Sequence, residues 1–195
     1  ACDADSRAFA RMLGYIRDHD PNHSVIAVQV ENEVGLLGTA RDYSSQANEL
    51  FGETVPAGLI TFLSERLDSL SPRLRQSLDL DRWPGSWSCV FGQDAAEIFM
   101  AYYMAAYINQ VTLAGKQVYP LPMFVNAWTI QCDDEPAGLH PSGGPLADFH
   151  EIWQYAAPEI DFFAPDLYLE RFKQECAAYT RLPGNPLFIP ETRMD

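Results

Sequence analysis

Basic residues are scarce in this chain of 195 residues, in which 13 Lys and Arg face 27 Asp and Glu, for a formal charge of −14. That imbalance disfavours nucleic acid and anionic membranes as partners, because both would repel the protein. A neutral small molecule or a sugar suits it better. Hydrophobic residues make up 47% of the chain and aromatic residues 12%. This is enough for one sizeable core, so we expect a single domain over residues 1–195.

Several motifs that mark common functional classes are also missing. The four cysteines (Cys2, Cys89, Cys132 and Cys176) form neither a CxxC pair nor a zinc-like cluster with histidine. We therefore expect buried thiols rather than metal ligands. The four histidines make no HxxxH or HExxH pattern and are expected at the surface or as capping residues. No apolar run approaches the roughly 18 residues that span a bilayer, and no signal-like segment opens the chain.

Phosphate-binding and calcium-binding loops are absent as well. The glycines after residue 33 make neither GxGxxG nor GxxxxGK[ST], which excludes a dinucleotide-binding fingerprint and a P-loop at this place. Asp133, Asp134 and Glu135 are acidic neighbours but lack the alternating ligand spacing of a calcium loop. We expect a solvated acidic loop there and no metal.

Two apolar stretches each end in a glutamate. Residues 25–33 read Val-Ile-Ala-Val-Gln-Val-Glu-Asn-Glu, and residues 186–193 read Pro-Leu-Phe-Ile-Pro-Glu-Thr-Arg. The first pattern predicts a fully buried parallel strand over 25–31 that delivers its last side chains to a loop. The second predicts a short strand over 187–191. Glu33 and Glu191 are thus expected just beyond or at the C-terminal tips of two strands.

The rest of the chain alternates between helical and strand patterns. A helix is expected before Pro21, and the longest one from a capping box at Asp94 and Glu97 to about Leu113, with Gly115 as C-cap. Residues 71–92 read as loop. Strands are expected over 122–128 and 160–168, with a helix opened by Pro145 between them.

This order predicts an α/β protein with parallel crossovers, either an open sheet or part of a (β/α)8 TIM barrel. The barrel is favoured because polar and aromatic residues recur at the C-terminal end of every strand, where barrel active sites lie. These residues are Asn32, Glu33, Asn126, Trp128, Tyr168 and Glu191.

Two glutamates across a barrel mouth suit glycoside cleavage. One, partly desolvated, protonates the leaving oxygen, and the other stays ionised and attacks the anomeric carbon. An asparagine beside the acid can bond the sugar 2-OH. A tyrosine near the nucleophile can donate to its carboxylate and hold it ionised.

The segment Val28-Gln29-Val30-Glu31-Asn32-Glu33, together with the later Ile189-Pro190-Glu191, resembles glycoside hydrolase family 35. These β-galactosidases belong to the clan of retaining (β/α)8 glycosidases. The resemblance is closest to a bacterial branch and covers essentially the whole chain. It implies that the chain runs from about helix 3 to strand 7 of the barrel, with residues 122–128 as strand five and 160–168 as strand six.

The resemblance also implies roles for individual residues. Glu33 would be the acid/base, Glu191 the nucleophile, Asn32 the partner of the 2-OH, and Tyr168 the support of the nucleophile. At Val34 the chain departs from the family, where many relatives place a tyrosine.

Three further residues are candidates for substrate contact. Asn126 and Trp128 could form a hydrogen-bonding and stacking wall, with core packing as the alternative for Trp128. Glu31 is a candidate for substrate contact or for an ion pair with Arg193 or Arg41.

The expected function is therefore a retaining exo-β-galactosidase that needs no cofactor and acts on a β-galactoside oligosaccharide or polysaccharide. An endo-β-glycanase of the same clan and a non-catalytic carbohydrate-binding barrel are the alternatives. Strands one to three and eight are absent, so we expect a fragment of a longer enzyme that is inactive alone. A polymer-degrading role favours the periplasm or the exterior.

Overall fold

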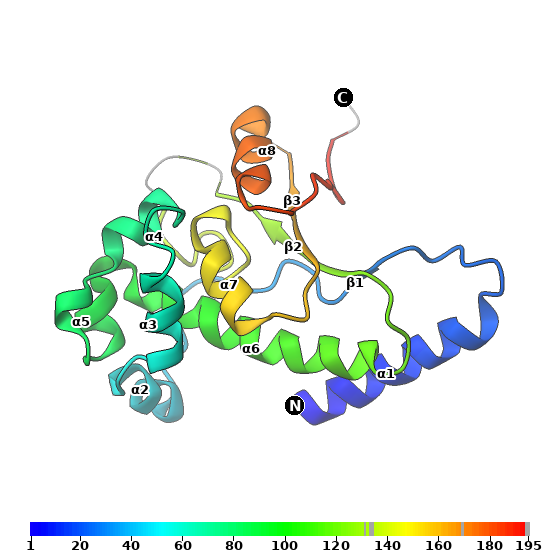
Figure 1. Ribbon diagram of the computed structural model, residues 1–195, viewed down its shortest axis with the longest axis horizontal. Coiled ribbons are helices and arrows are strands. Elements are labelled where there is room, and N and C mark those ends of the chain that lie inside the picture. The colour runs from blue at the N-terminus through cyan, green and yellow to red at the C-terminus, as the bar shows by residue number, and fades with distance from the viewer. Residues whose placement is uncertain (131, 133–134, 169, 194–195) are drawn as a thin grey trace.

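The computed structural model describes residues 1–130, 132, 135–168 and 170–193. Its strands β1 (Val28–Gln29), β2 (Met123–Trp128) and β3 (Phe162–Asp166) form one parallel sheet in the order β1-β2-β3. The helices are α1 (Cys2–His19), α2 (Ser45–Gly52), α3 (Ala57–Ser64), α4 (Pro72–Ser77), α5 (Trp87–Phe91), α6 (Ala95–Lys116), α7 (His150–Ala156) and α8 (Phe172–Arg181). The described residues also form three short 3-10 helices: η1 (Leu80–Arg82), η2 (Gly92–Asp94) and η3 (Ala147–Phe149). The α/β class is confirmed, as an open three-stranded parallel sheet flanked by helices (Figure 1).

The central strand β2 divides its side chains between two faces. Phe124 stacks on Phe162 of β3, while Met123 approaches α6, where a Cβ on Gly115 would lie 3.3 Å from its Cε. Because side chains alternate along a strand, Asn126 and Trp128 share the face of Phe124. The polar end of that face is where the candidate site lies.

The long helix α6 organises the core. It is buried on more than one side, as its nearly continuous apolar sequence predicts. Figure 1 shows α1 alongside one end of α6 and α2 to α5 gathered near the other. Gly115 lies within α6 rather than beyond it, contrary to the expected C-cap. A Cβ there would lie 2.4 Å from Phe9, so the missing side chain lets α1 pack closely.

Strand β1 is shorter and less buried than its sequence predicts. Only Val28 and Gln29 form the strand, and Ile26 is 78% exposed although Val28 and Val30 are buried. The reason is its position at the sheet edge, because among the described residues β1 pairs with β2 alone. A strand covered on one face shows alternating rather than continuous burial.

The last predicted strand, residues 187–191, does not form. One parallel bridge joins Leu167 to Thr192, and the Leu167 N–H donates to the Glu191 carbonyl at 2.9 Å. Pro186 and Pro190 supply no N–H groups to a ladder, which explains the missing strand. The segment is held instead by Phe188, whose ring packs edge-on against the stacked Phe124 and Phe162.

Residues 71–92 contain the short helices α4, η1 and α5 joined by short connecting segments, rather than the loop expected throughout. Ser71 caps α4 by accepting a hydrogen bond from the Leu74 N–H, and Pro72 occupies the first turn. Trp87 begins α5 and is 1% exposed. Ser-Pro is itself a helix-start signal, and the many aromatic and glycine residues nearby masked it.

Other local expectations also need correction. The helix expected from Pro145 starts later, with η3 at Ala147. His140 and His150 are fully buried rather than at the surface. None of the cysteines is buried: Cys89 and Cys132 are exposed, and the other two are half-buried.

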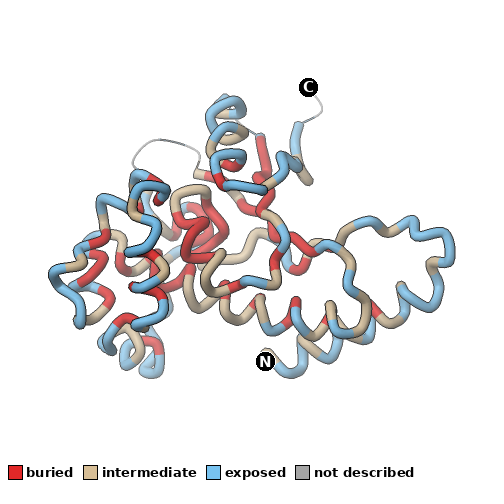
Figure 2. Tube along the Cα trace, in the orientation of Figure 1, coloured by how far each residue is buried: buried red, intermediate tan, exposed pale blue. Residues whose placement is uncertain are grey.

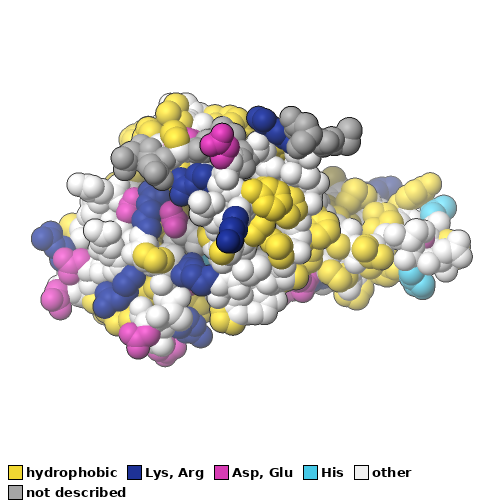
Figure 3. Space-filling model, turned by 90° about the horizontal axis from the view of Figure 1, so that it is seen from above, with side chains coloured by type: hydrophobic (Ala, Val, Ile, Leu, Met, Phe, Trp, Pro, Cys, Tyr) yellow, Lys and Arg dark blue, Asp and Glu magenta, His cyan; other side chains and the backbone are white. Residues whose placement is uncertain are grey.

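Buried residues concentrate around the sheet, α6 and α7 (Figure 2). Seen from above, the narrower end of the molecule, formed by the end of α1 and the loop after it, exposes hydrophobic side chains (Figure 3). Tyr15, 65% exposed, and Ile26 belong to this end. Across the described residues, every helix is too short or too polar to cross a membrane.

Candidate active site

Three carboxylates meet at the C-terminal edge of the sheet. Glu33 follows β1, Asp166 ends β3, and Glu191 lies in the segment beside β3. One oxygen from each carboxylate lies within 4.8 Å of the other two. We name these three residues the carboxylate cluster. They border a cavity of about 410 Å³ whose lining is Glu33, Trp128, Thr129, Asp166, Tyr168, Glu191 and Arg193.

The backbone at Glu33 is held in an unusual conformation. Its φ angle is +46°, in the left-handed region that non-glycine residues seldom adopt. Its N–H donates to Asn126 Oδ1 at 2.9 Å. Such local strain, fixed by a buried partner, is typical of functional positions. The turn ends the extended segment and brings the Glu33 carboxylate to the other two.

Asn126 is fully buried and joins the site residues to one another. Its Nδ2 donates to Asn32 Oδ1 at 3.1 Å and to Asp166 Oδ2 at 2.8 Å. Gln29 Nε2 also donates to Asn32 Oδ1, at 3.0 Å. One amide therefore fixes parts of three segments, because its position on β2 is central in the sheet.

Asp166 is the most buried member of the carboxylate cluster, with 3% exposure. Burial, and then the charges of Glu191 and Glu33, raise its pKa from the usual 3.8 to about 8. Asp166 Oδ1 has no hydrogen-bond donor among the described residues. An acid in this environment is protonated at neutral pH.

The two glutamates have different surroundings. Burial, and then the charge of Glu191, raise the pKa of Glu33. Glu191 Oε2 accepts a hydrogen bond from the Tyr168 hydroxyl at 2.7 Å. That bond raises the pKa of Tyr168 to about 12.

The structure brings most of the residues predicted for the site together. Glu33, Glu191, Trp128 and Tyr168 line the cavity, whereas Asn32 and Asn126 are not among its lining residues and are hydrogen-bonded to each other.

Glu31 does not join them. It lies at the surface. Partial desolvation, and then the charge of Asp5, raise its pKa. The expected ion pair is not found in the described part of the chain, where Arg41 lies over the rings of Tyr43 and Phe51.

Three lining residues of the cavity were not predicted from the sequence: Asp166, Thr129 and Arg193. One signal could have found Asp166. It precedes Tyr168 by two positions in an otherwise apolar strand pattern, so the two side chains share a face.

One oxygen from each of the three carboxylates lies where it could contact a common cation, but acidic groups often occur close together without an ion. We assign no ion to the carboxylate cluster. Of the acidic loop considered as a calcium ligand set, Asp133 and Asp134 lie outside the described residues. Glu135 lies 3.4 Å from the Nδ1 atom of His140.

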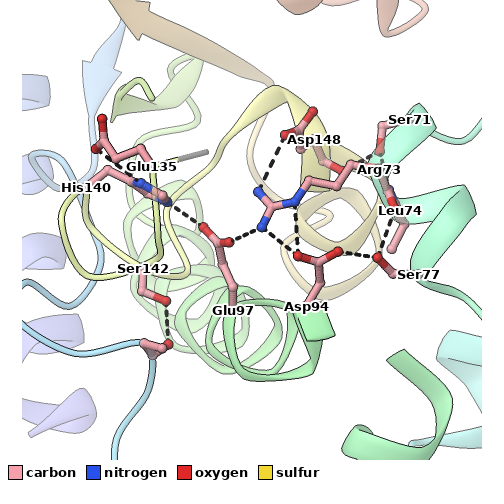
Figure 4. A network of polar contacts seen from close by, with 11 residues as sticks. Ser71, Arg73, Leu74, Ser77, Asp94, Glu97, Glu135, His140, Ser142 and Asp148 are labelled. Carbon is pink, nitrogen blue, oxygen red and sulfur yellow. Dashed lines mark hydrogen bonds and ion pairs between the residues drawn. The ribbon is translucent and has the colours of Figure 1, made fainter. Parts of the chain in front are cut away.

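A second charged group, the Arg73 cluster, lies at the start of α6 (Figure 4). Arg73 is 2.6 Å from Asp94, 2.8 Å from Glu97 and 3.6 Å from Asp148. His140 Nε2 lies 2.7 Å from the other oxygen of Glu97. Asp94 and Glu97 therefore each form an ion pair with Arg73. They do not form the capping box expected from the sequence, since the Asp94 side chain makes no cap hydrogen bond.

A larger cavity, of about 560 Å³, lies beside the Arg73 cluster. Arg73 and Asp148 line it together with Arg171 and Glu175. Its charges are of both signs, and Arg73 and Asp148 already pair. We therefore place the candidate site at the smaller, acidic cavity.

Neither the protein-family models nor the curated proteins compared with this chain give a match.

Proposed function

We propose that this chain carries the catalytic residues of a retaining β-glycosidase, a β-galactosidase of the family 35 type, on part of a (β/α)8 barrel. The observation that carries the proposal is the approach of the Glu33 and Glu191 carboxylates, with oxygens within 4.8 Å. Retaining glycosidases separate the two groups by roughly 5 to 5.5 Å, whereas inverting enzymes leave room for a water.

The reaction proceeds in two displacements. Glu191 attacks the anomeric carbon while Glu33 gives its proton to the leaving oxygen, which takes the electron pair of the broken C–O bond. Water then donates a proton to Glu33 and attacks the same carbon, and Glu191 departs as a carboxylate. Two inversions restore the original configuration, and no cofactor takes part.

The raised pKa of Glu33 and the hydrogen bond from Tyr168 to Glu191 support this assignment of roles. Trp128 offers a ring to the C–H face of a sugar. Asn32 lies beside the acid as the expected 2-OH partner, held by Asn126 and Gln29. The galactose preference rests on the resemblance alone, and the exo mode with it.

The open sheet also supports a longer barrel. Phe188 is 42% exposed and Leu187 48%, close to the stacked rings of β2 and β3. Further strands would cover such a surface. We use the term parent polypeptide for the complete natural polypeptide that contains these 195 residues, and activity is to be measured on it.

The test is covalent trapping of the nucleophile. The parent polypeptide is incubated with a 2-deoxy-2-fluoro-β-galactoside that carries an activated leaving group, then digested and analysed by mass spectrometry. We expect one fluorosugar on the peptide that contains Glu191, and none in the Glu191→Gln variant. The corresponding fluoroglucoside and fluoromannoside test the sugar.

Each outcome separates the alternatives. A label at Glu191 excludes a non-catalytic carbohydrate-binding barrel. If only activated oligosaccharide probes label the protein, and the single fluorosugar does not, the enzyme cleaves within a polysaccharide chain. The proposal of an exo-acting β-galactosidase would then give way to that of an endo-β-glycanase. A label on another residue, or none, contradicts the proposal.

A further inference from the structure

Asp166 is the one carboxylate of the cluster that the two-glutamate reaction does not use. It lines the same cavity as Glu33 and Glu191, yet it is 3% exposed, while both glutamates are half-buried. A carboxylate buried beside two others carries a large electrostatic cost unless a proton or a cation offsets it. This cost suggests that Asp166 has a role in the site.

A single buried amide connects Asp166 to the acid/base. Asn126 Nδ2 donates to Asp166 Oδ2 at 2.8 Å, and Asn126 Oδ1 accepts from the Glu33 N–H at 2.9 Å. The other oxygen, Asp166 Oδ1, receives no donor from the described residues. Oδ1 is therefore the atom that can carry a proton and donate it, because Oδ2 already accepts.

We infer that Asp166 and Glu33 hold one exchangeable proton between them, and that Asp166 stores this proton and passes it to Glu33 during the reaction. This inference deepens the proposed function and rests on it for the catalytic steps. Asp166 acts through Glu33, so its role is to position and hold a proton rather than to touch the sugar.

The proton balance closes over one turnover. The proton moves from Asp166 Oδ1 to Glu33 and from Glu33 to the leaving oxygen, so the pair gains one negative charge. At the same time Glu191 loses its charge in the ester, and the charge of the cluster is unchanged. In the second half, water returns a proton to Glu33 and Glu33 to Asp166, while Glu191 regains its charge.

The electrostatics of the site support this storage. Burial, and then the charges of Glu191 and Glu33, bring the pKa of Asp166 to about 8. Asp166 is more buried than Glu33, so burial favours its protonated form more strongly. The proton therefore resides on Asp166 near neutral pH. The titratable or charged groups around it are Glu33, Tyr168, Tyr179, Glu191 and Arg193.

The decisive variant is Asp166→Asn in the parent polypeptide. The asparagine oxygen can still accept from Asn126 and its amide can still donate toward Glu33, but it cannot release a proton. In the wild type we expect kcat to fall at high pH with a midpoint near 8. In the variant this midpoint should move to lower pH by about one unit or more, because Glu33 alone then holds the proton.

Thr129→Val is the matched control. Thr129 lines the same cavity and its hydroxyl contacts the Asp166 carbonyl at 3.4 Å, but it has no titrating group. We expect kcat of Thr129→Val to fall at high pH with the same midpoint as in the wild type, whatever the absolute value of kcat. A purely structural role for Asp166 would lower kcat in Asp166→Asn without moving the midpoint, and that result would overturn the inference.

Carboxyl ¹³C NMR tests the pair without turnover. In the wild type, the Asp166 resonance should titrate near pH 8, and Glu33→Gln should lower its midpoint because one like charge is gone. An Asp166 midpoint near 4, or one that Glu33→Gln leaves unmoved, overturns the inference while fluorosugar trapping can still succeed. A coupled titration in a protein that traps no sugar supports the shared proton and overturns only the proposed glycosidase.

Discussion

The carboxylate cluster and the Arg73 cluster both contain buried acids, but they balance charge in different ways. Arg73 contacts three acids, and His140 contacts one of them from the other side. In the carboxylate cluster, no described cation forms an ion pair with any of the three acids. The first arrangement offsets the cost of buried charge, and the second leaves it in place.

The difference suggests that the Arg73 cluster contributes to stability and the carboxylate cluster to chemistry. Paired acids connect α4, α6 and the loops near them, and their loss weakens the fold. Asp166, whose pKa is raised to about 8, holds a proton at neutral pH, which is useful for catalysis and costly for stability. Substitutions should therefore act in opposite directions in the two clusters.

The largest effect is expected from Glu33→Gln on catalysis. In the parent polypeptide, kcat for a galactoside with a poor leaving group should fall by roughly 10³- to 10⁴-fold, because the general acid is gone. Thermal unfolding should show a melting temperature at or above that of the wild type, since one like charge is removed from the cluster. Turnover close to the wild-type rate would contradict the assignment.

The next effect is on stability and comes from Arg73→Met. This change leaves Glu97, which is 2% exposed, without its cation and should cost about 3 kcal/mol in the free energy of unfolding. Urea titration measures it. Arg82→Met is the control, since the Arg82–Asp79 pair is exposed and should cost less than about 1 kcal/mol. Equal losses in both variants would remove the contrast between the two clusters.

The pH dependence of stability distinguishes the clusters in a third way. The pKa of Asp166 is about 8 in the folded protein, above the ordinary 3.8, so folding favours its protonated form. Its stabilising contribution is complete below pH 3.8, declines as the pH rises, and is lost above pH 8.

We therefore expect the stability of Asp166→Asn relative to the wild type to increase as the pH rises through this range, reaching a gain on the order of 3 kcal/mol at pH 9. Urea titrations at pH 4 and pH 9 measure the difference. A gain of the same size at both pH values would show that burial of Asp166 does not couple to its proton.

The smallest effect is expected from Tyr168→Phe. The variant loses the hydrogen bond to Glu191, so kcat should fall roughly 10- to 100-fold. The melting temperature should hardly change, because Tyr168 is 39% exposed. A large loss of stability with unchanged kcat would place Tyr168 with the structural residues instead.

Local patterns predicted the parallel order of the strands and the meeting of Glu33 with Glu191. Strand ends are visible in a sequence because apolar runs stop there, and parallel strands end at one edge. The same reasoning overextended β1 and the segment 187–191. Edge position and the prolines, rather than hydrophobicity, limit pairing there.

The Arg73 cluster could not be predicted in this way. Its acids resemble an ordinary capping box, and their cation lies on another helix, more than 20 positions earlier. The charge state of Asp166 was hidden for a different reason. A single acid within a strand pattern gives no sign of its charge state until its neighbours in space are known.

The carboxylate cluster draws one residue from each of three distant segments, and residues 33 and 191 are 158 positions apart. Closing so long a separation costs chain entropy that local contacts do not offset. Helix α6 can form from neighbouring residues, whereas the site forms only when both segments have docked on β2 and β3. Catalytic activity should therefore be a stricter reporter of complete folding than helical circular dichroism.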